Sequence, residues 1–379
     1  MTYGKDRRFF DLVNELSSGQ LFVRQLDENT RPGMIRLDSN ENPFGPSPLA
    51  LEAMRASLEH SNLYPDDEST PLRHKLAELH EVPAEQVQVT AGSTQMLSLL
   101  CQTLLGPGLN AVTSERSFVV YGMAVRAAGA QLIEAPMRSD GINLTAMLDL
   151  INEHTRLVFL ANPNNPTGTL LDATTIEKFV ADITSHVTVV LDEAYGEFAS
   201  YFAERRKTQH SPSLSYVRRG QNVVVLKTFS KVHGLAGLRI GYGLGPAELM
   251  KYCAGLRNTF SVSSMAQGAA LAAMDDRTHI QRTLVNNAEQ SEILGAGLSE
   301  LGFRVVPTWA NFMYCNVGQE ASALAETLRE QNISVRPLER WGAPGCVRVS
   351  IGTPQQNEAL LQALQFMRAK VPNVQVAGE

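Results

Sequence analysis

Short apolar runs alternate with stretches of helical periodicity along most of the chain. Leu157–Leu160, Val187–Leu191 and Val223–Leu226 are apolar at nearly every position, which is typical of strands buried on both faces of a parallel sheet. Between the first two runs, a helical face is formed by Ile176, Phe179, Val180 and Ile183. Strands that alternate with helices in this way predict an α/β fold with a mainly parallel sheet and right-handed crossovers.

Two helices are predicted to begin at a hydroxyl residue followed by proline. Ser47-Pro48 and Thr70-Pro71 each place a side-chain acceptor at the N-cap and proline at the first helical position. Apolar residues then recur at helical spacing, at Ala50, Met54 and Leu58 in the first helix and at Leu72, Leu76 and Leu79 in the second.

The last part of the chain has a different pattern. A helix over Ala321–Glu330 is followed by two strand-like segments, Ile333–Pro337 and Cys346–Ile351. Thr353-Pro354-Gln355-Gln356 then forms a capping box that opens a final helix. These elements predict a smaller α+β domain at the end of the chain.

The length of 379 residues also indicates more than one packed unit. We expect residues 1–40 to form an N-terminal arm or part of the small domain. Residues 41–260 are predicted to form the large domain and residues 261–379 the small one, with a hinge near residues 246–275.

Charge and cysteine content narrow the class of protein. Lys and Arg number 33 and Asp and Glu 39, and the resulting net charge of −6 gives no electrostatic footprint for nucleic acid or an anionic membrane. No apolar run has the length of a membrane span or of a signal peptide core. Cys101, Cys253, Cys315 and Cys346 form no CxxC pair, which disfavours a disulfide framework or a zinc site. We expect a cytoplasmic enzyme without a metal.

Common nucleotide, metal and hydrolase motifs are absent from the chain. There is no GxxxxGK[ST], HExxH or GxSxG sequence. The glycine-rich run Gly241-Tyr242-Gly243-Leu244-Gly245 is followed by Pro246, where a dinucleotide fingerprint needs a third glycine.

Four polar segments carry the candidate chemistry, and three of them lie at or just beyond the ends of predicted buried strands. They are Asn162-Pro163-Asn164-Asn165-Pro166-Thr167-Gly168, Leu191-Asp192-Glu193-Ala194-Tyr195, Lys227-Thr228-Phe229-Ser230-Lys231 and Gly237-Leu238-Arg239-Ile240-Gly241. Taken singly, each has a plain structural explanation: an irregular turn, a strand-end carboxylate, a solvated lysine or a surface ion pair. Because ligands bind at the carboxyl ends of parallel strands, the four together favour one shared site.

In order and spacing, these segments resemble the fold-type I, pyridoxal-phosphate-dependent aminotransferases of class I and II. Similarity to the histidinol-phosphate aminotransferase branch rests on Ser39-Asn40-Glu41-Asn42-Pro43-Phe44-Gly45-Pro46, Asn62-Leu63-Tyr64-Pro65-Asp66 and Ile333-Ser334-Val335-Arg336-Pro337. The resemblance covers residues 36 to about 367. It implies pyridoxal 5′-phosphate as the cofactor.

The resemblance also implies roles at the cofactor ring. Lys231 would form the Schiff base with the cofactor and move a proton, and Asp192 would pair with the pyridine nitrogen. Asn165 and Tyr195 would hydrogen-bond the 3′-oxygen. Phe118 would stack on the ring, with Tyr121 as the second choice.

Contacts to the cofactor phosphate are implied for a set of donors and one cation, and this set consists of Gly92, Ser93, Thr94, Thr228, Ser230 and Arg239. Gly92-Ser93-Thr94 could also be no more than the start of a helix. Tyr64 matches the tyrosine that reaches the phosphate from a neighbouring subunit, which implies a homodimer with shared sites.

Substrate contacts are implied for Arg348, Arg336 and Asn40. The two arginines match family residues that hold an anionic group, and Asn40 lies in the segment that lines the entrance. The alternative for Arg336 is a surface residue of the small domain. The segment Ser18–Arg24 has no tyrosine where histidinol-phosphate enzymes usually carry one, and Leu338–Gly342 adds a tryptophan that resembles relatives acting on aromatic or broader amino acids.

The function implied is transfer of an amino group from histidinol phosphate to 2-oxoglutarate, which gives imidazole acetol phosphate and glutamate. Aromatic or broad-specificity amino acids are the close alternative. A lyase, decarboxylase or cyclase on the same scaffold is another, since it begins with the same attachment to the cofactor. A non-catalytic regulator is disfavoured, because only about 40 residues precede the catalytic-type region and they contain no basic recognition helix.

Overall fold

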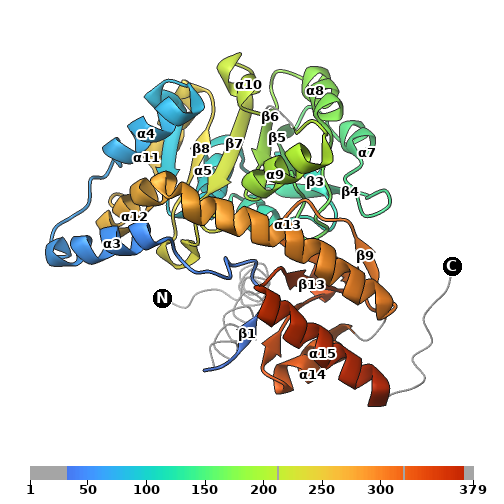
Figure 1. Cartoon of the computed structure of the whole chain (residues 1–379). Helices are drawn as coiled ribbons and strands as arrows, with labels where there is room; N and C mark the ends of the chain where they lie inside the picture. The colour runs from blue at the N-terminus through green and yellow to red at the C-terminus, as the bar shows by residue number, and fades with distance from the viewer. Residues whose placement is uncertain (1–31, 211–212, 319–320, 371–379) are drawn as a thin grey trace, which may run out of the picture.

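The computed structural model describes residues 32–210, 213–318 and 321–370. The segment Ser18–Arg24 and most of the predicted arm therefore lie outside the described residues. At the centre is a seven-stranded sheet in the order β2-β8-β7-β6-β5-β3-β4 (Figure 1). Its strands are β2 (Val87–Thr90), β3 (Asn110–Ser114), β4 (Gln131–Ala135), β5 (Thr155–Ala161), β6 (Thr188–Asp192), β7 (Val223–Thr228) and β8 (Gly241–Leu244). Only β8 runs antiparallel to its neighbours within this sheet, so the prediction of an α/β fold with a mainly parallel sheet is confirmed.

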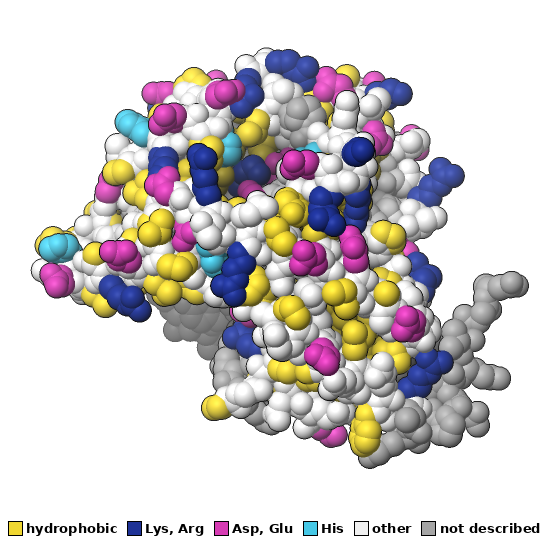
Figure 2. All heavy atoms as spheres, in the orientation of Figure 1, with side chains coloured by type: hydrophobic (Ala, Val, Ile, Leu, Met, Phe, Trp, Pro, Cys, Tyr) yellow, Lys and Arg dark blue, Asp and Glu magenta, His cyan; other side chains and the backbone are white. Residues whose placement is uncertain are grey.

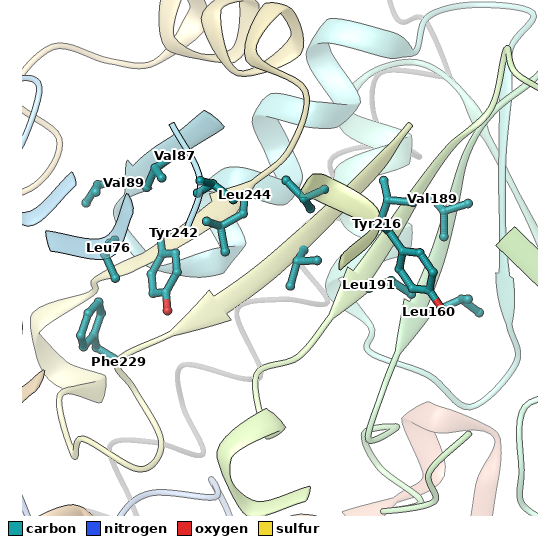
Figure 3. Close-up of a cluster of buried hydrophobic side chains, with 14 of the residues drawn as sticks. Leu76, Val87, Val89, Leu160, Val189, Leu191, Tyr216, Phe229, Tyr242 and Leu244 are labelled. Atoms are coloured by element: carbon teal, nitrogen blue, oxygen red, sulfur yellow. The ribbon is translucent and has the colours of Figure 1, made fainter. Parts of the chain in front are cut away.

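The three apolar runs form the centre of this sheet, as predicted. Alternate residues of a strand point to opposite faces, and each face has its own apolar core. Val189 and Leu191 pack on one face, where Figure 3 shows Tyr216 beside them, whereas Phe159 and Val190 belong to the core on the other face. Continuous apolar sequence is thus explained by helices that cover both sides of the sheet.

Helices flank this sheet and continue into the C-terminal part of the chain. They are α3 (Pro48–Ser57), α4 (Thr70–His80), α5 (Gly92–Leu104), α6 (Val120–Ala127), α7 (Leu144–Asp149), α8 (Ala173–Asp182), α9 (Gly196–Arg206), α10 (Ser213–Arg218), α11 (Ala247–Leu256), α12 (Ser264–Asp275), α13 (Arg277–Glu300), α14 (Ala321–Glu330) and α15 (Pro354–Lys370). Short 3-10 turns are η1 (Leu58–His60), η2 (Ala84–Gln86), η3 (Ala236–Leu238) and η4 (Glu339–Trp341).

The two predicted helix starts differ in outcome. Ser47 caps α3 as expected, since its hydroxyl accepts a hydrogen bond from the backbone N–H of Ala50 at 3.1 Å. The prediction of Thr70 as a cap is wrong, because Thr70 is already helical and its N–H donates to the carboxylate of Asp66 at 2.6 Å. Leu79 was also misplaced in the apolar stripe of α4, as its side chain is 59% exposed.

A second, antiparallel sheet lies below the first in Figure 1 and has the order β12-β13-β10-β9. Its strands are β9 (Arg304–Val306), β10 (Phe312–Asn316), β12 (Arg336–Leu338) and β13 (Ala343–Ser350), and a separate parallel pair is formed by β1 (Ile35–Arg36) and β11 (Ile333–Ser334). The capping box is confirmed, because the Thr353 N–H donates to Gln356 Oε1 at 2.9 Å and the Gln356 N–H to Thr353 Oγ1 at 3.3 Å.

The domain ranges stay predictions. Helix α12 contributes Ala266, Ala269 and Ala270 to the core cluster of the large sheet, whereas Leu294 and Leu298 of α13 pack in the core beside the small sheet. Figure 1 shows α13 extending from α12 to β9. The packing favours a boundary within α13 rather than near residue 260.

The surface visible in Figure 2 carries basic and acidic side chains interspersed, with no extended area of one sign. None of the helices in the described ranges combines the length and apolarity that crossing a bilayer requires. Within those ranges, no group of three or more His, Cys, Asp or Glu side chains is placed to hold a metal ion.

Candidate active site

A cavity of about 920 Å³ lies at the carboxyl ends of β5, β6 and β7 and reaches the small sheet. It is lined by nearly all of the residues singled out in the sequence. Those from the large-sheet side are Ser93, Thr94, Phe118, Asn165, Asp192, Tyr195, Thr228, Ser230, Lys231 and Arg239. Those from the other side are Asn40, Arg336 and Arg348. Gly92 and Tyr64 are not among the lining residues.

Lys231 follows β7 and presents its amine in the cavity. Its Nζ donates hydrogen bonds to the carbonyl oxygens of Ser39 and Asn40, both at 3.2 Å. Burial lowers the pKa of Lys231 to about 7, and the positive charges of Arg348 and Arg239 act in the same direction. A substantial fraction of this amine is therefore neutral, and nucleophilic, near neutral pH.

Asp192 ends β6 and is only 5% exposed. Its Oδ2 accepts a hydrogen bond from the Tyr121 hydroxyl at 2.9 Å, and its Oδ1 accepts one from the N–H of Ala194 at 3.1 Å. Burial nevertheless raises the pKa of Asp192 to about 6, against the lowering effect of these two bonds. The ionised form of this buried carboxylate would be stabilised by a cationic N–H group that enters the cavity.

The structure separates the two aromatic candidates for stacking. Phe118 lines the cavity, whereas Tyr121 is buried beneath it and stacks on Phe159 with ring centroids 4.8 Å apart. The second choice is therefore wrong as a stacking residue. Tyr121 instead contacts the carboxylate of Asp192, a role that sequence reasoning missed because it depends on how α6 lies on the sheet.

A chain of hydrogen bonds joins the two sheets across the cavity. The Tyr195 hydroxyl accepts hydrogen bonds from the side-chain amides of Asn40 at 2.9 Å and Asn165 at 3.4 Å. Asn165 Oδ1 in turn accepts a hydrogen bond from Arg348 Nη1 at 2.7 Å. A substrate role for Asn40 stays a prediction, since its amide is engaged with Tyr195.

One end of the cavity is suited to an anion. Ser93 and Thr94 are in the first turn of α5, whose free N–H groups and dipole favour negative charge. Arg239 lies against the start of this helix: a Cβ on Gly92, where φ is +75°, would be 2.6 Å from Arg239 Nη2. Glycine thus permits both the backbone conformation and the approach of the guanidinium. An anion bound between the start of α5 and the Arg239 guanidinium would be stabilised by both.

At the other end, two buried arginines face the cavity. Arg336 is 4% exposed and its Nη2 lies 3.2 Å from Asp38 Oδ2, so its interpretation as a surface residue is wrong. Arg348 is 6% exposed and donates from Nη2 to the Asp38 carbonyl at 2.8 Å. Burial lowers the pKa of Arg348 to about 10, which still leaves it cationic at neutral pH.

Several lining residues were missed in the sequence. Glu41, Arg126 and Arg340 also border the cavity, and no role was assigned to them from the sequence. Tyr64 lies away from the cavity, is 82% exposed and stacks on Phe260 with ring centroids 4.6 Å apart.

The family model of aminotransferase class I and II matches residues 32–364. The chain belongs to this family. Histidinol-phosphate aminotransferase 2 of Pseudomonas fluorescens is 40% identical to it over 348 residues, 92% of each chain. Histidinol-phosphate aminotransferase 2 of Pseudomonas aeruginosa is 41% identical over 331 residues, 87% of this chain and 88% of the relative.

Solved structures agree with this assignment to the class I and II aminotransferases. Histidinol-phosphate aminotransferase from Sinorhizobium meliloti, solved in complex with pyridoxal-5′-phosphate, is 28% identical with a TM-score of 0.80 and covers 89% of this chain and 91% of its own. A mutant aspartate aminotransferase from Thermus thermophilus is 25% identical with a TM-score of 0.78, over 94% of this chain and 96% of its own. The fold-type I architecture and the predicted resemblance are thereby confirmed.

Proposed function

We propose that this aminotransferase binds pyridoxal 5′-phosphate in the cavity and transfers an amino group from histidinol phosphate to 2-oxoglutarate. The observation that carries the proposal is the convergence of three features in one cavity: an anion site at Arg239, an amine of lowered pKa at Lys231 and a carboxylate of raised pKa at Asp192. The Pseudomonas relatives and the cofactor complex of the Sinorhizobium meliloti enzyme support it.

The residues present fit this cofactor. The start of α5 and Arg239 would hold its phosphate, Asp192 its pyridine N–H, and Phe118 one face of its ring. When bound, pyridoxal phosphate supplies an electron sink that allows the Cα–H bond of an amino substrate to be broken.

Lys231 has two functions in this proposal. As a neutral amine it provides the covalent anchor, and once released its Nζ takes up and returns the substrate proton. The pKa of about 7 suits both functions, because it keeps the amine close to balance between its two protonation states at neutral pH. The Ser39 and Asn40 carbonyls hold the amine in place when it carries the proton.

Arg348 and Arg336 would hold one anionic group of the substrate, either a phosphate or a carboxylate. Guanidinium groups match both geometries, which allows one site to serve the two half-reactions. Trp341 also lines the cavity and favours the second candidate function, transamination of aromatic amino acids.

An absorbance titration tests the proposed function. The purified protein is loaded with pyridoxal phosphate and then mixed separately with glutamate, histidinol phosphate and phenylalanine, with no acceptor present. We expect a visible band that histidinol phosphate and glutamate convert to the shorter-wavelength amine form, and we expect no such band in Lys231→Ala. Conversion by phenylalanine but not by histidinol phosphate would favour the aromatic function. A Lys231-dependent band with release of ammonia or carbon dioxide would indicate a lyase or decarboxylase.

We further propose a homodimer with shared sites. Leu58, Leu63, Tyr64 and Phe260 are large apolar residues with exposed side chains, and such a surface is typical of a contact with another chain. Light scattering measures the mass in solution, and a monomer at micromolar concentration would contradict the proposal.

The four cysteines are free and buried, which supports a cytoplasmic location; fractionation of cells tests this.

A further inference from the structure

A group of charged side chains lies behind the cofactor end of the large sheet and has no role in the proposed chemistry. This charge cluster consists of Lys227 near the end of β7 and of Glu193 and Glu197, which follow β6. Lys227 Nζ lies 3.4 Å from Glu193 Oε2 and 3.4 Å from Glu197 Oε1. The side chains of Lys227 and Glu193 are 11% and 5% exposed, so their pair is largely removed from water, whereas Glu197 is partly exposed.

The cluster is the reverse side of the strand ends that form the site. Lys227 precedes Thr228 and Glu193 follows Asp192, and both of these neighbours line the cavity. Because successive residues of a strand point to opposite faces, Lys227 and Glu193 are directed to the other face of the sheet. The Glu193 N–H donates to the Leu226 carbonyl at 2.9 Å, which fixes the two strand ends to each other. Asp192 itself pairs with Leu226 in the strand register, one residue before Lys227.

Neighbouring residues hold these charges in place. The Ser213 hydroxyl donates a hydrogen bond to Glu193 Oε1. At Gly196, a Cβ would lie 3.1 Å from Lys227 Nζ and 3.2 Å from Glu193 Cβ, so glycine leaves the space that this pair occupies. Loss of the amine would leave a buried carboxylate without a cation, which is costly.

The members of the cluster keep one another ionised. Burial alone would lower the pKa of Lys227, but the carboxylates of Glu197 and Glu193 raise it well above its usual value. Burial also opposes the charged form of Glu197, yet the charge of Lys227 is foremost among the effects that lower its pKa overall. The cluster therefore holds two negative charges and one positive charge at neutral pH.

Other titratable groups face the cluster or Asp192 from the elements packed around them. They are His80 on α4, His210 after α9, His233 after β7, Tyr121 on α6, Tyr195 after β6 and Tyr242 on β8. Burial lowers the pKa of each histidine, for His80 to about 4, and raises the pKa of each tyrosine, so these groups are neutral near neutral pH. Arg218 of α10 lies near His80 and pairs with Glu81 at 3.2 Å.

Glu193 is the member of the cluster that acts on Asp192. Burial is the main reason why the pKa of Asp192 is raised, and the like charge of Glu193 acts in the same direction. On the cavity side, the Tyr121 hydroxyl and the Lys231 amine favour the ionised form. Lys227 contacts Glu193 from the other face of the sheet, so its charge offsets the one that disfavours ionised Asp192.

We propose that Lys227 is a positioning residue for Asp192, which it keeps ionised toward a cationic ring nitrogen by offsetting the charge of Glu193. The inference rests on the proposed function, because it needs a cofactor whose ring nitrogen faces Asp192. It adds a second row of charges that lies outside the cavity and supports the first. Without the offset, the cofactor end of the site should lose its ligand at a higher pH as the solution is acidified.

Binding of pyridoxamine phosphate tests the proposal without turnover. This compound has the ring nitrogen but no aldehyde that could react with Lys231. Its dissociation constant is measured by fluorescence on the full-length apoprotein across about pH 5 to 8, and the acid midpoint is the pH at which the affinity is half lost. In Lys227→Met we expect the acid midpoint to rise by about one unit, because the charge of Glu193 is no longer offset. Lys227→Arg keeps the positive charge and should stay close to the wild type.

Two further variants test the proposal even where Lys227→Met does not fold. Glu193→Gln removes the like charge itself, so the acid midpoint should fall by about one unit. The double variant Glu193→Gln with Lys227→Met removes both charges and leaves the partly exposed Glu197, so its acid midpoint should return close to that of the wild type. Opposite shifts in the single variants that cancel in the double variant are expected of charge and not of packing.

Glu177→Gln is the matched control, since Glu177 forms an exposed ion pair with Arg219 at 3.0 Å on the surface. It should leave the acid midpoint unchanged. Weaker binding in the cluster variants with one common acid midpoint would mean that the cluster only supports packing, and the proposal would be overturned. Shifts of the same size in an Asp192→Asn background would overturn it as well, because the charges would then act on another group.

The outcomes separate this inference from the proposed function. If the acid midpoints follow the expected order but no amine converts the pyridoxal phosphate band, the role of Lys227 stands and the aminotransferase function fails. If histidinol phosphate converts the band and the acid midpoint is the same in every variant, the aminotransferase function stands and the role of Lys227 fails.

Discussion

Tyr121 donates a hydrogen bond to Asp192 from below the cavity, across 2.9 Å. A hydrogen bond to the ionised form of a carboxylate lowers its pKa. Burial raises the pKa of Asp192 to about 6, close to neutral pH, so the hydrogen bond from Tyr121 decides whether this carboxylate is charged there. Tyr121 is thus placed to position and ionise the residue that we assign to the pyridine nitrogen.

Tyr121→Phe should therefore make cofactor binding more sensitive to acid. Without the phenol, the Asp192 pKa rises, so the carboxylate is lost at a higher pH as the solution is acidified. We expect the affinity of the apoprotein for pyridoxal phosphate to decline, as the solution is acidified, at a pH about one unit higher than in the wild type. Fluorescence titration across pH 5 to about pH 8 measures it. Tyr242→Phe removes a buried phenol that bonds His80 instead, and should leave the profile unchanged.

The amine of Lys231 should control how fast the cofactor is captured. Only the neutral amine attacks the aldehyde, so the capture rate should rise with pH through the Lys231 pKa of about 7. The positive charge of Arg348 helps to lower this pKa. Arg348→Gln should then raise it and displace the rise to more alkaline pH. Stopped-flow absorbance measures the rate, and an unchanged profile in this variant would contradict the electrostatic coupling.

Arg336 and Asp38 form a buried ion pair, and each partner should be costly to remove alone. Arg336→Gln takes the cation away from a carboxylate that is 1% exposed, and we expect about 3 kcal/mol lower free energy of unfolding. The double variant Asp38→Asn with Arg336→Gln should recover most of the stability but not substrate affinity. Denaturant unfolding and KM, measured on the same three proteins, distinguish the structural contribution from the binding one.

Gly92→Ala should weaken the phosphate end of the site. The added Cβ would lie 2.6 Å from Arg239 Nη2, in a backbone conformation with φ of +75° that disfavours side chains. We expect a roughly tenfold loss of pyridoxal phosphate affinity and about 1 kcal/mol of stability. At Gly108 φ is also positive, at +86°, but a Cβ meets nothing within 4 Å, so Gly108→Ala is the matched control. Equal affinities in both variants would argue against a phosphate contact at this helix start.

The sequence signals were strongest where burial is complete. Strands β5, β6 and β7 were identified because both faces of the sheet are covered, which requires apolar residues in succession. Strand β8 was missed because Gly241-Tyr242-Gly243-Leu244 has little β propensity. Gly241 lies so close to the backbone of Ser93 that a side chain would not fit at this position. Polar residues after parallel strands were brought together as expected, since their carboxyl ends meet at one edge.

Contacts that depend on tertiary packing could not be predicted. The hydroxyl of Tyr121 and the guanidinium of Arg126 lie on α6, and their surroundings are set by how that helix lies on the sheet. Thr70 has the same sequence signal as Ser47, but Asp66 is already folded against the helix start and accepts its N–H. A local pattern does not distinguish between two such acceptors.

The hydrogen bond between Arg348 and Asn165 joins the two halves of the cavity, and it marks the boundary between the residues of the two sheets. The features that fit the cofactor come from the seven-stranded sheet, whereas Arg336 and Arg348 come from the four-stranded one. Changes confined to the smaller sheet can therefore alter which amine is accepted while the cofactor end is inherited intact. A scaffold divided in this way can acquire new substrates without rebuilding its chemistry.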